Sequence, residues 1–225
     1  MQLRRPAAIR ALLFDMDGTL VDSMPAHARS WEVFCRRHGV DLSVEEVLKR
    51  TTGRTGIECM RELFGPDVDE TRAFTLVGEK EAIYRELFAP AFRPVPGVRE
   101  AVANAQSAGL QVAIATAGDR HNIAFTLGHL HLAQPVNAVV GGDQGLRGKP
   151  EPDLFLEAAR LLGRAPPECL VFEDAPFGIE AAHRAGMQAV AICTTHSPAE
   201  LAGAHVIARF ADYLPLLRAG FFDPM

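Results

Sequence analysis

The chain has 225 residues, of which 48% are hydrophobic and 23% charged, and its formal net charge at pH 7 is −5. This length allows one large domain or two small ones, while the mild negative charge argues against nucleic acid or an anionic membrane as a partner. No apolar stretch of signal-peptide length follows the N-terminal arginines, and none approaches the length of a membrane span. We therefore expect a cytoplasmic protein without nucleic-acid or membrane partners. We also expect a monomer, although the sequence itself carries no signal for the oligomeric state.

The first predicted element is a buried parallel strand over residues 9–14, an apolar run that only Arg10 interrupts. It leads into the sequence Asp-Met-Asp-Gly-Thr at residues 15–19. Two carboxylates two residues apart would lie on one face of a continuing extended chain, and Gly18 allows the chain to turn there. Adjacent anions repel, so such a site either raises one pKa or holds a cation, and oxygen ligands suit Mg²⁺. On these residues alone, an acidic turn without a chemical role is an equally good interpretation.

Residues 26–90 show apolar residues at helical spacing and few strand-like alternations. The pattern indicates one helix from about residue 27 to 38, a second around 44–48, a third around 57–64 and a fourth around 76–87. Three prolines and a glycine between residues 90 and 97 then break the pattern, as in a linker. We expect residues 23–92 to form an inserted all-α, four-helix cap domain that moves over a core made of residues 1–22 and 93–225.

From residue 97 onward, predicted strands and helices alternate. Strands are expected at 111–115, 138–140, 170–172, 189–193 and 205–208, and helices at 98–108, from 119 to about 127, from 152 to about 163, and at 176–185. This alternation predicts an α/β fold, with a Rossmann-like three-layer core whose parallel sheet is covered by helices on both faces.

Polar residues follow several of these strands directly. Asp15, Thr116 and Asp174 each come immediately after a predicted strand, and Lys149 lies in a loop on the same side. Because ligands bind at the carboxyl ends of parallel strands, we expect these separate segments to converge on one site. Convergence makes the acidic-turn interpretation a poor one.

Four spaced segments together resemble the motifs of the haloacid dehalogenase-like superfamily, whose phosphatases use an aspartate nucleophile. They are, in order, Asp-Met-Asp-Gly-Thr-Leu-Val at 15–21, Ala-Thr-Ala-Gly at 115–118, Gly-Lys-Pro at 148–150, and Phe-Glu-Asp-Ala-Pro-Phe-Gly-Ile at 172–179. The resemblance spans roughly residues 9–195. Its last motif and its cap are most similar to the beta-phosphoglucomutase and sugar-phosphatase branch.

The resemblance implies a role for each acidic residue of the motifs. Asp15 would be the nucleophile that forms an aspartyl-phosphate, and Asp17 would protonate the leaving oxygen and then act as base on water. Mg²⁺ would be bound by the carboxylates of Asp15 and Asp174 and by the backbone carbonyl of Asp17. Glu173 is either a further metal ligand or a partner of one, and the sequence leaves both open.

The same resemblance assigns the phosphate contacts. The Thr116 hydroxyl and the following amides, with Ala117 first, would donate to the phosphate, and the Lys149 ammonium would screen the nucleophile from it. Standing alone, Thr116 could simply end a strand and Lys149 could be a solvated surface lysine. The Gly-Lys-Pro-Glu-Pro-Asp context and the need to offset several acids favour the functional interpretation of Lys149. We also hypothesise a cis Lys149–Pro150 bond.

Three residues of the predicted cap are candidates for substrate binding. His27 could be a structural histidine, and Lys80 could snorkel to water. Members of the beta-phosphoglucomutase and sugar-phosphatase branch, however, carry a histidine and a lysine at these places. In beta-phosphoglucomutases an arginine stands three residues after a loop glycine. The loop here is Gly-Arg-Thr-Gly at 53–56, so Gly56 occupies that place, and Arg54 could substitute only from another direction.

The leading functional hypothesis is a Mg²⁺-dependent phosphatase of a small phosphorylated metabolite, foremost a sugar phosphate. The alternative is a beta-phosphoglucomutase-type phosphohexomutase, which returns the phosphoryl group to sugar. A haloacid dehalogenase fits poorly because such enzymes lack the second aspartate, here Asp17. A non-catalytic binding protein would be expected to have lost at least one of Asp15, Asp17, Lys149 and Asp174.

Asp15→Asn is predicted to abolish turnover while leaving the fold intact, because an amide cannot attack phosphorus. Hydrolysis of an aryl phosphate measures turnover, and circular dichroism checks the fold. Wild-type rates in this variant would show that Asp15 is not the nucleophile.

Overall fold

A computed structural model describes residues 4–132 and 136–224 of the chain. Residues 1–3, 133–135 and 225, which the expected core includes, lie outside the described residues. The described strands are β1 (Ala11–Phe14), β2 (Gln111–Ala115), β3 (Ala138–Val140), β4 (Cys169–Glu173), β5 (Gln188–Ile192) and β6 (Val206–Phe210). They form one parallel sheet in the order β3-β2-β1-β4-β5-β6. β1 is therefore central, and the order of the strands along the chain reverses beside it, which is where open α/β sheets bind ligands.

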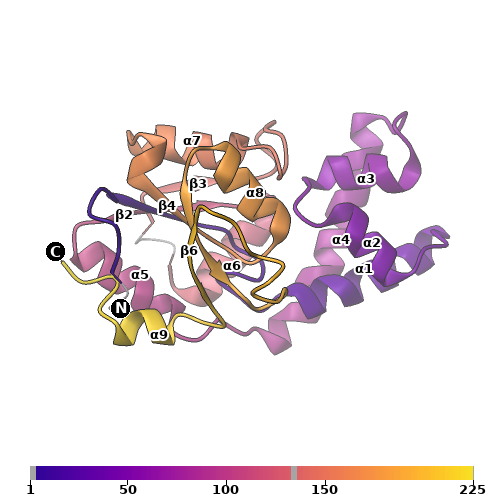
Figure 1. The fold of residues 1–225 in the computed structure, drawn as a ribbon. Helices are drawn as coiled ribbons and strands as arrows, with labels where there is room; N and C mark the ends of the chain where they lie inside the picture. Colours follow the sequence, from indigo (N-terminus) through magenta and orange to yellow (C-terminus); the bar gives the residue numbers. More distant parts are fainter. Residues whose placement is uncertain (1–3, 133–135, 225) are drawn as a thin grey trace.

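Helices cover both faces of this sheet (Figure 1). Those of the core are α5 (Val98–Ser107), α6 (Arg120–Leu130), α7 (Asp153–Leu162), α8 (Pro176–Arg184) and α9 (Leu214–Arg218), with a short 3-10 turn at Pro166–Glu168. Successive strand residues point to opposite faces, so Leu12 and Phe14 join one buried cluster while Ala11 and Leu13 join the other. This is the predicted three-layer α/β core.

Four helices between residues 24 and 88 pack together beside the sheet (Figure 1). They are α1 (Met24–His38), α2 (Val44–Thr51), α3 (Gly56–Phe64) and α4 (Glu70–Phe88), followed by a 3-10 turn at Ala89–Ala91. They share a hydrophobic cluster of their own, which includes Trp31, Phe34 and Met60. The two chain crossings to the core pair with each other, since the Asp22 amide donates to the Arg93 carbonyl at 2.9 Å. We call residues 23–92 the helical insert.

The structure differs from the predicted elements mainly at their ends. α6 continues past Gly128 because Leu130, in its last turn, is buried in the core. β4 begins at Cys169 and β6 extends to Phe210, and α9 was not predicted, because its five residues are too few to show helical periodicity. Among the described residues, no helix is both long and apolar enough to cross a bilayer.

Phe172→Ala is expected to lower the free energy of unfolding by about 3–5 kcal/mol. The Phe172 ring stacks on Phe14 of the central strand at a centroid distance of 4.6 Å and is fully buried. Urea denaturation measures the loss. The matched control is Phe74→Ala, which removes a ring that is 48% exposed and should cost about 0.5 kcal/mol or less. Equal losses in the two variants would contradict the assignment of Phe172 to the core.

Candidate active site

The polar residues that follow the central strands line one cavity of about 970 Å³ between the sheet edge and the helical insert. In the sheet, Phe14 pairs with both Ile114 and Phe172, so the ends of β1, β2 and β4 lie side by side. The cavity wall includes Asp15 after β1, Thr116 after β2, and Glu173 and Asp174 at the end of β4. Lys149, from the loop before α7, completes this part of the wall.

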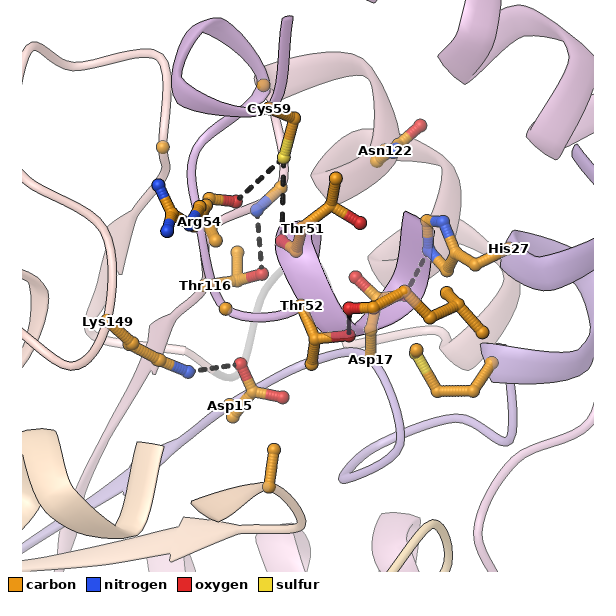
Figure 2. Close-up of a pocket in the computed structure, with 18 of the residues that line it drawn as sticks. Asp15, Asp17, His27, Thr51, Thr52, Arg54, Cys59, Thr116, Asn122 and Lys149 are labelled. Atoms are coloured by element: carbon orange, nitrogen blue, oxygen red, sulfur yellow. Dashed lines mark hydrogen bonds and ion pairs between the residues drawn. The ribbon is translucent and has the colours of Figure 1, made fainter. Parts of the chain in front are cut away.

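Lys149 is buried between two carboxylates, and Figure 2 shows its contact with one of them, Asp15. Its Nζ donates to Asp15 Oδ1 at 2.5 Å and to Glu173 Oε1 at 2.7 Å, and its side chain is only 3% exposed. Burial by itself lowers the pKa of Lys149, but the charges of these two carboxylates raise it above its ordinary value. The alternative interpretation of Lys149, as a solvated surface lysine, is therefore wrong. The Lys149–Pro150 bond is cis, as hypothesised.

Asp15, Glu173 and Asp174 form an acidic cluster, each offering a carboxylate oxygen within 4.8 Å of the others. Burial, and then the neighbouring carboxylates, raise the pKa of Asp174 well above its ordinary value. Burial also raises the pKa of Asp15 to about 7, although Lys149 opposes this. Three carboxylates against one ammonium leave the ionised cluster short of positive charge. Hard oxygen donors with this excess of negative charge fit a divalent cation such as Mg²⁺.

Two of the three cluster carboxylates have further partners that fix them. Asp174 accepts from the Thr19 hydroxyl at 3.2 Å and, on its other oxygen, from the Thr195 hydroxyl. Both oxygens of Glu173 are engaged, one by Lys149 and the other by the Ala175 amide at 2.6 Å. This geometry favours Glu173 as the residue that positions Lys149 rather than as a metal ligand.

Asp17 contacts the helical insert through one carboxylate oxygen, and Figure 2 shows its contact with His27. Its Oδ1 accepts from the Ser23 hydroxyl at 2.7 Å, lies 3.1 Å from His27 Nε2, and accepts from the Tyr84 hydroxyl at 3.3 Å. Burial alone would raise the pKa of Asp17, but His27 and then Ser23 lower it to about 2. Although Asp15 and Asp17 are only two residues apart in sequence, their surroundings shift their pKa values in opposite directions.

Lys80 is 2% exposed and does not snorkel to water. Its Nζ donates to His27 Nδ1 at 2.8 Å and to Glu81 Oε1 at 2.9 Å, and it lies over the Trp31 ring. Because an ammonium has only donors, Nδ1 of His27 must accept, and Nε2 carries the hydrogen that points at Asp17. The snorkelling alternative for Lys80 is therefore wrong. The structural interpretation of His27 holds in part, since its side chain is only 12% exposed and is hydrogen-bonded. Both residues nevertheless line the cavity beside Asp17.

The network continues from the insert into the core through Asn122 of α6. Its side-chain amide donates to Glu81 Oε2 at 2.6 Å and accepts from Arg85 at 2.8 Å. Sequence patterns did not indicate Ser23, Glu81 or Asn122. Tyr84 was also missed, although it lies four residues after Lys80, a spacing that places the two on one face of α4.

The remaining predicted residues are less enclosed or less central. The Arg54 side chain is 44% exposed and its guanidinium lies 3.4 Å from Glu62, although Arg54 does line the cavity. Thr116 is buried, and its hydroxyl accepts from the Gly118 amide at 3.0 Å. Ala117 also lines the cavity. A further contact joins insert and core, because Glu58 accepts from the Gly148 amide at 3.3 Å.

Comparison with known proteins supplies the family. A family model described as haloacid dehalogenase-like hydrolase matches residues 9–186. The chain belongs to the haloacid dehalogenase-like hydrolases. The match confirms the family that the four motifs indicated. The acidic cluster, Lys149 and Thr116 all lie within the matched residues.

Several relatives of this hydrolase are named phosphatases. It is 38% identical over 191 residues to hexitol phosphatase A of Escherichia coli (strain K12), covering 81% of this chain and 82% of the relative. It is 33% identical to fructose-1-phosphate phosphatase YqaB of the same organism, covering 80% and 94%. A crystal structure of a hydrolase from Pseudomonas syringae superposes with a TM-score of 0.80 at 28% identity, covering 92% and 96%.

Asp174→Asn is expected to stabilise the metal-free protein near neutral pH while removing its response to Mg²⁺. Because folding raises the pKa of Asp174, its ionised form destabilises the native state increasingly as the pH rises above the unfolded value. The amide variant should therefore melt higher than wild type in EDTA at about pH 8, and the gap should shrink as the pH falls toward about 4. Each kcal/mol corresponds to about 2–4 °C in a chain of this size.

Thermal melts with and without Mg²⁺ measure both effects. Asp41→Asn is the matched control, because it makes the same change of charge at an exposed position and should alter neither the midpoint nor the Mg²⁺ response. If Asp174→Asn melts below wild type at every pH, the burial of charge does not dominate at this residue.

Proposed function

We propose that this hydrolase is a Mg²⁺-dependent phosphatase that removes phosphate from a small sugar phosphate through an aspartyl-phosphate on Asp15. The observation that carries the proposal is the opposed environment of two aspartates on one cavity. Asp15 lies against a buried lysine and two further carboxylates, whereas Asp17 is held by hydroxyl and imidazole groups of the insert. The names of the two Escherichia coli relatives support a sugar phosphate or hexitol phosphate as substrate.

In the first half-reaction, the Asp15 carboxylate attacks phosphorus in line with the ester oxygen. A P–O bond to Asp15 forms, the P–O bond to the sugar oxygen breaks, and Asp17 gives its proton to that oxygen. The side chains of Asp15 and Asp174 and the backbone carbonyl of Asp17 would hold Mg²⁺, which neutralises charge on the phosphoryl oxygens when bound. Lys149 and the Thr116 hydroxyl contribute further donors to those oxygens. A lysine already bonded to Asp15 keeps the nucleophile directed into the cavity.

Asp17 serves both half-reactions as acid and then as base. In the substrate-free protein its pKa is about 2, so it is a carboxylate. A phosphoryl dianion bound beside it raises that pKa, which favours the protonated form that the leaving oxygen needs. Once the sugar has left, the Asp17 carboxylate takes a proton from the water that attacks phosphorus of the aspartyl-phosphate. The P–O bond to Asp15 breaks, which releases phosphate and restores the Asp15 carboxylate.

Water rather than sugar is the proposed acceptor of the phosphoryl group. A mutase must also hold a second phosphate, and the place of the mutase arginine is Gly56, where even a Cβ would lie 2.7 Å from Val77 of α4. Four cationic side chains of the cavity contact carboxylates within the protein, namely Lys149, Lys80, Arg120 and Arg54, whereas Lys49, which also lines it, has no ion pair among the described residues. The glycine at position 56 is therefore the observation that favours a substrate with a single phosphate.

We also propose that the insert, residues 23–92, is a cap that opens and closes over the core of residues 1–22 and 93–225, hinging at residues 20–24 and 88–94. The two paired crossings and the few polar contacts between insert and core support this layout. Asp17 loses its partners on the insert if the cap swings away, so closure would complete the acid–base site. The monomeric state and cytoplasmic location stay predictions.

Phosphate release from sorbitol 6-phosphate and fructose 1-phosphate is expected with Mg²⁺ and should fall by at least about 100-fold in EDTA. A colorimetric phosphate assay measures it, with Asp15→Asn as the inactive control. The mutase alternative is tested in parallel with beta-glucose 1-phosphate and a trace of glucose 1,6-bisphosphate. Formation of glucose 6-phosphate in preference to inorganic phosphate would overturn the phosphatase proposal.

A further inference from the structure

A glycine interrupts the longest helix of the insert. α4 spans Glu70–Phe88, and Gly78 lies near its midpoint. Glycine is the poorest helix former apart from proline, because it loses the most backbone freedom on folding. Where a helical glycine lines a cavity, its place can be explained by a special backbone angle, a close packing contact or space left for a ligand.

The chain itself supplies neither of the first two reasons for Gly78. It is not among the glycines with positive φ, and a Cβ built on it would meet no atom of the described residues within 4 Å beyond its own helix and chain neighbours. The other glycines of the cavity wall differ. Gly53 has positive φ. A Cβ at any of the others would lie within 3.2 Å of another residue, and these are Gly56, Gly118 and Gly142.

Gly78 lines the active-site cavity, on the face of α4 that also presents Phe74 and Glu81. Glu81 is one turn further along and bonds Lys80, which bonds His27 beside Asp17. A turn of helix advances about 5 Å, so Gly78 lies about one turn from Glu81, whose partner Lys80 bonds the imidazole beside Asp17. A substrate whose phosphate is at Asp15 would direct its distal carbons toward this part of the wall.

We infer that Gly78 determines substrate specificity by keeping the cavity wall open for the distal carbons and hydroxyls of a polyol or sugar monophosphate. The inference rests on the proposed function and adds a length requirement to it. A side chain at position 78 would fill space that a six-carbon substrate needs and a three-carbon substrate does not reach.

Gly78→Ala, Gly78→Leu and Gly128→Ala test this inference. Gly128 is the matched control, because it is also an exposed helical glycine whose Cβ would meet nothing, and it does not line the cavity. Both alanine variants should raise the thermal midpoint by about 2–4 °C. Gly128→Ala should leave the kinetics of both substrates unchanged.

Steady-state kinetics on sorbitol 6-phosphate and glycerol 3-phosphate supply the readout. Gly78→Leu should lower the ratio of kcat/KM for the six-carbon over the three-carbon substrate by at least about 10-fold, mainly through KM, and Gly78→Ala should lower it less. An unchanged ratio, whether both substrates lose equally or neither does, overturns the inference while the phosphatase stands. If the wild-type protein hydrolyses neither ester, the proposed function fails and this inference fails with it.

Discussion

The buried contact of Lys149 with Asp15 and Glu173 is the interaction on which the active site depends. Charges taken out of water are costly unless they are paired, and the sheet brings two acidic strand ends together here because β1 and β4 are neighbours. One ammonium at 2.5 and 2.7 Å from the two carboxylates makes this arrangement tolerable. Two glycines leave room for the crowded carboxylates, since a Cβ at Gly18 would lie 2.1 Å from Asp174 and one at Gly178 would lie 1.8 Å from Glu173.

The division of labour between Asp15 and Asp17 follows from which part of the chain surrounds each of them. The pKa of Asp15 is about 7 because the core buries it among acids, and the pKa of Asp17 is about 2 because the insert gives it donors. In the metal-free, substrate-free protein these values are the reverse of what the first half-reaction needs. A bound cation would lower the pKa of Asp15, and a bound phosphate would raise that of Asp17. The low pKa of Asp17 depends on contact between the insert and the core. The position of the four helices therefore affects the protonation state of Asp17.

The sequence was sufficient for the parts of the structure that local patterns encode. The apolar run before Asp15 predicted the central strand, and strand-end positions predicted that Thr116 and Asp174 would meet Asp15. The contact of Tyr84 with Asp17 could not be found in this way, because Tyr84 is 67 residues away and reaches Asp17 only when α4 packs against the core. Asn122 was hidden for the same reason, since its partners lie on another helix. Contacts between residues of different helices and strands can be identified only once the packing of those elements is known.

Several features of the cavity lower the stability of the folded protein, and they are found together. Asp174 is buried with a raised pKa, and Gly78 weakens the middle of α4. Neither feature helps the chain to fold, whereas the stacked Phe14 and Phe172 rings just behind the same strand ends do. Selection for stability alone would remove an unneeded buried charge or a helix-breaking glycine, because most such changes raise the free energy of unfolding. Their presence around one cavity is what a binding and catalytic role predicts, because the binding of cation and substrate stabilises the folded protein.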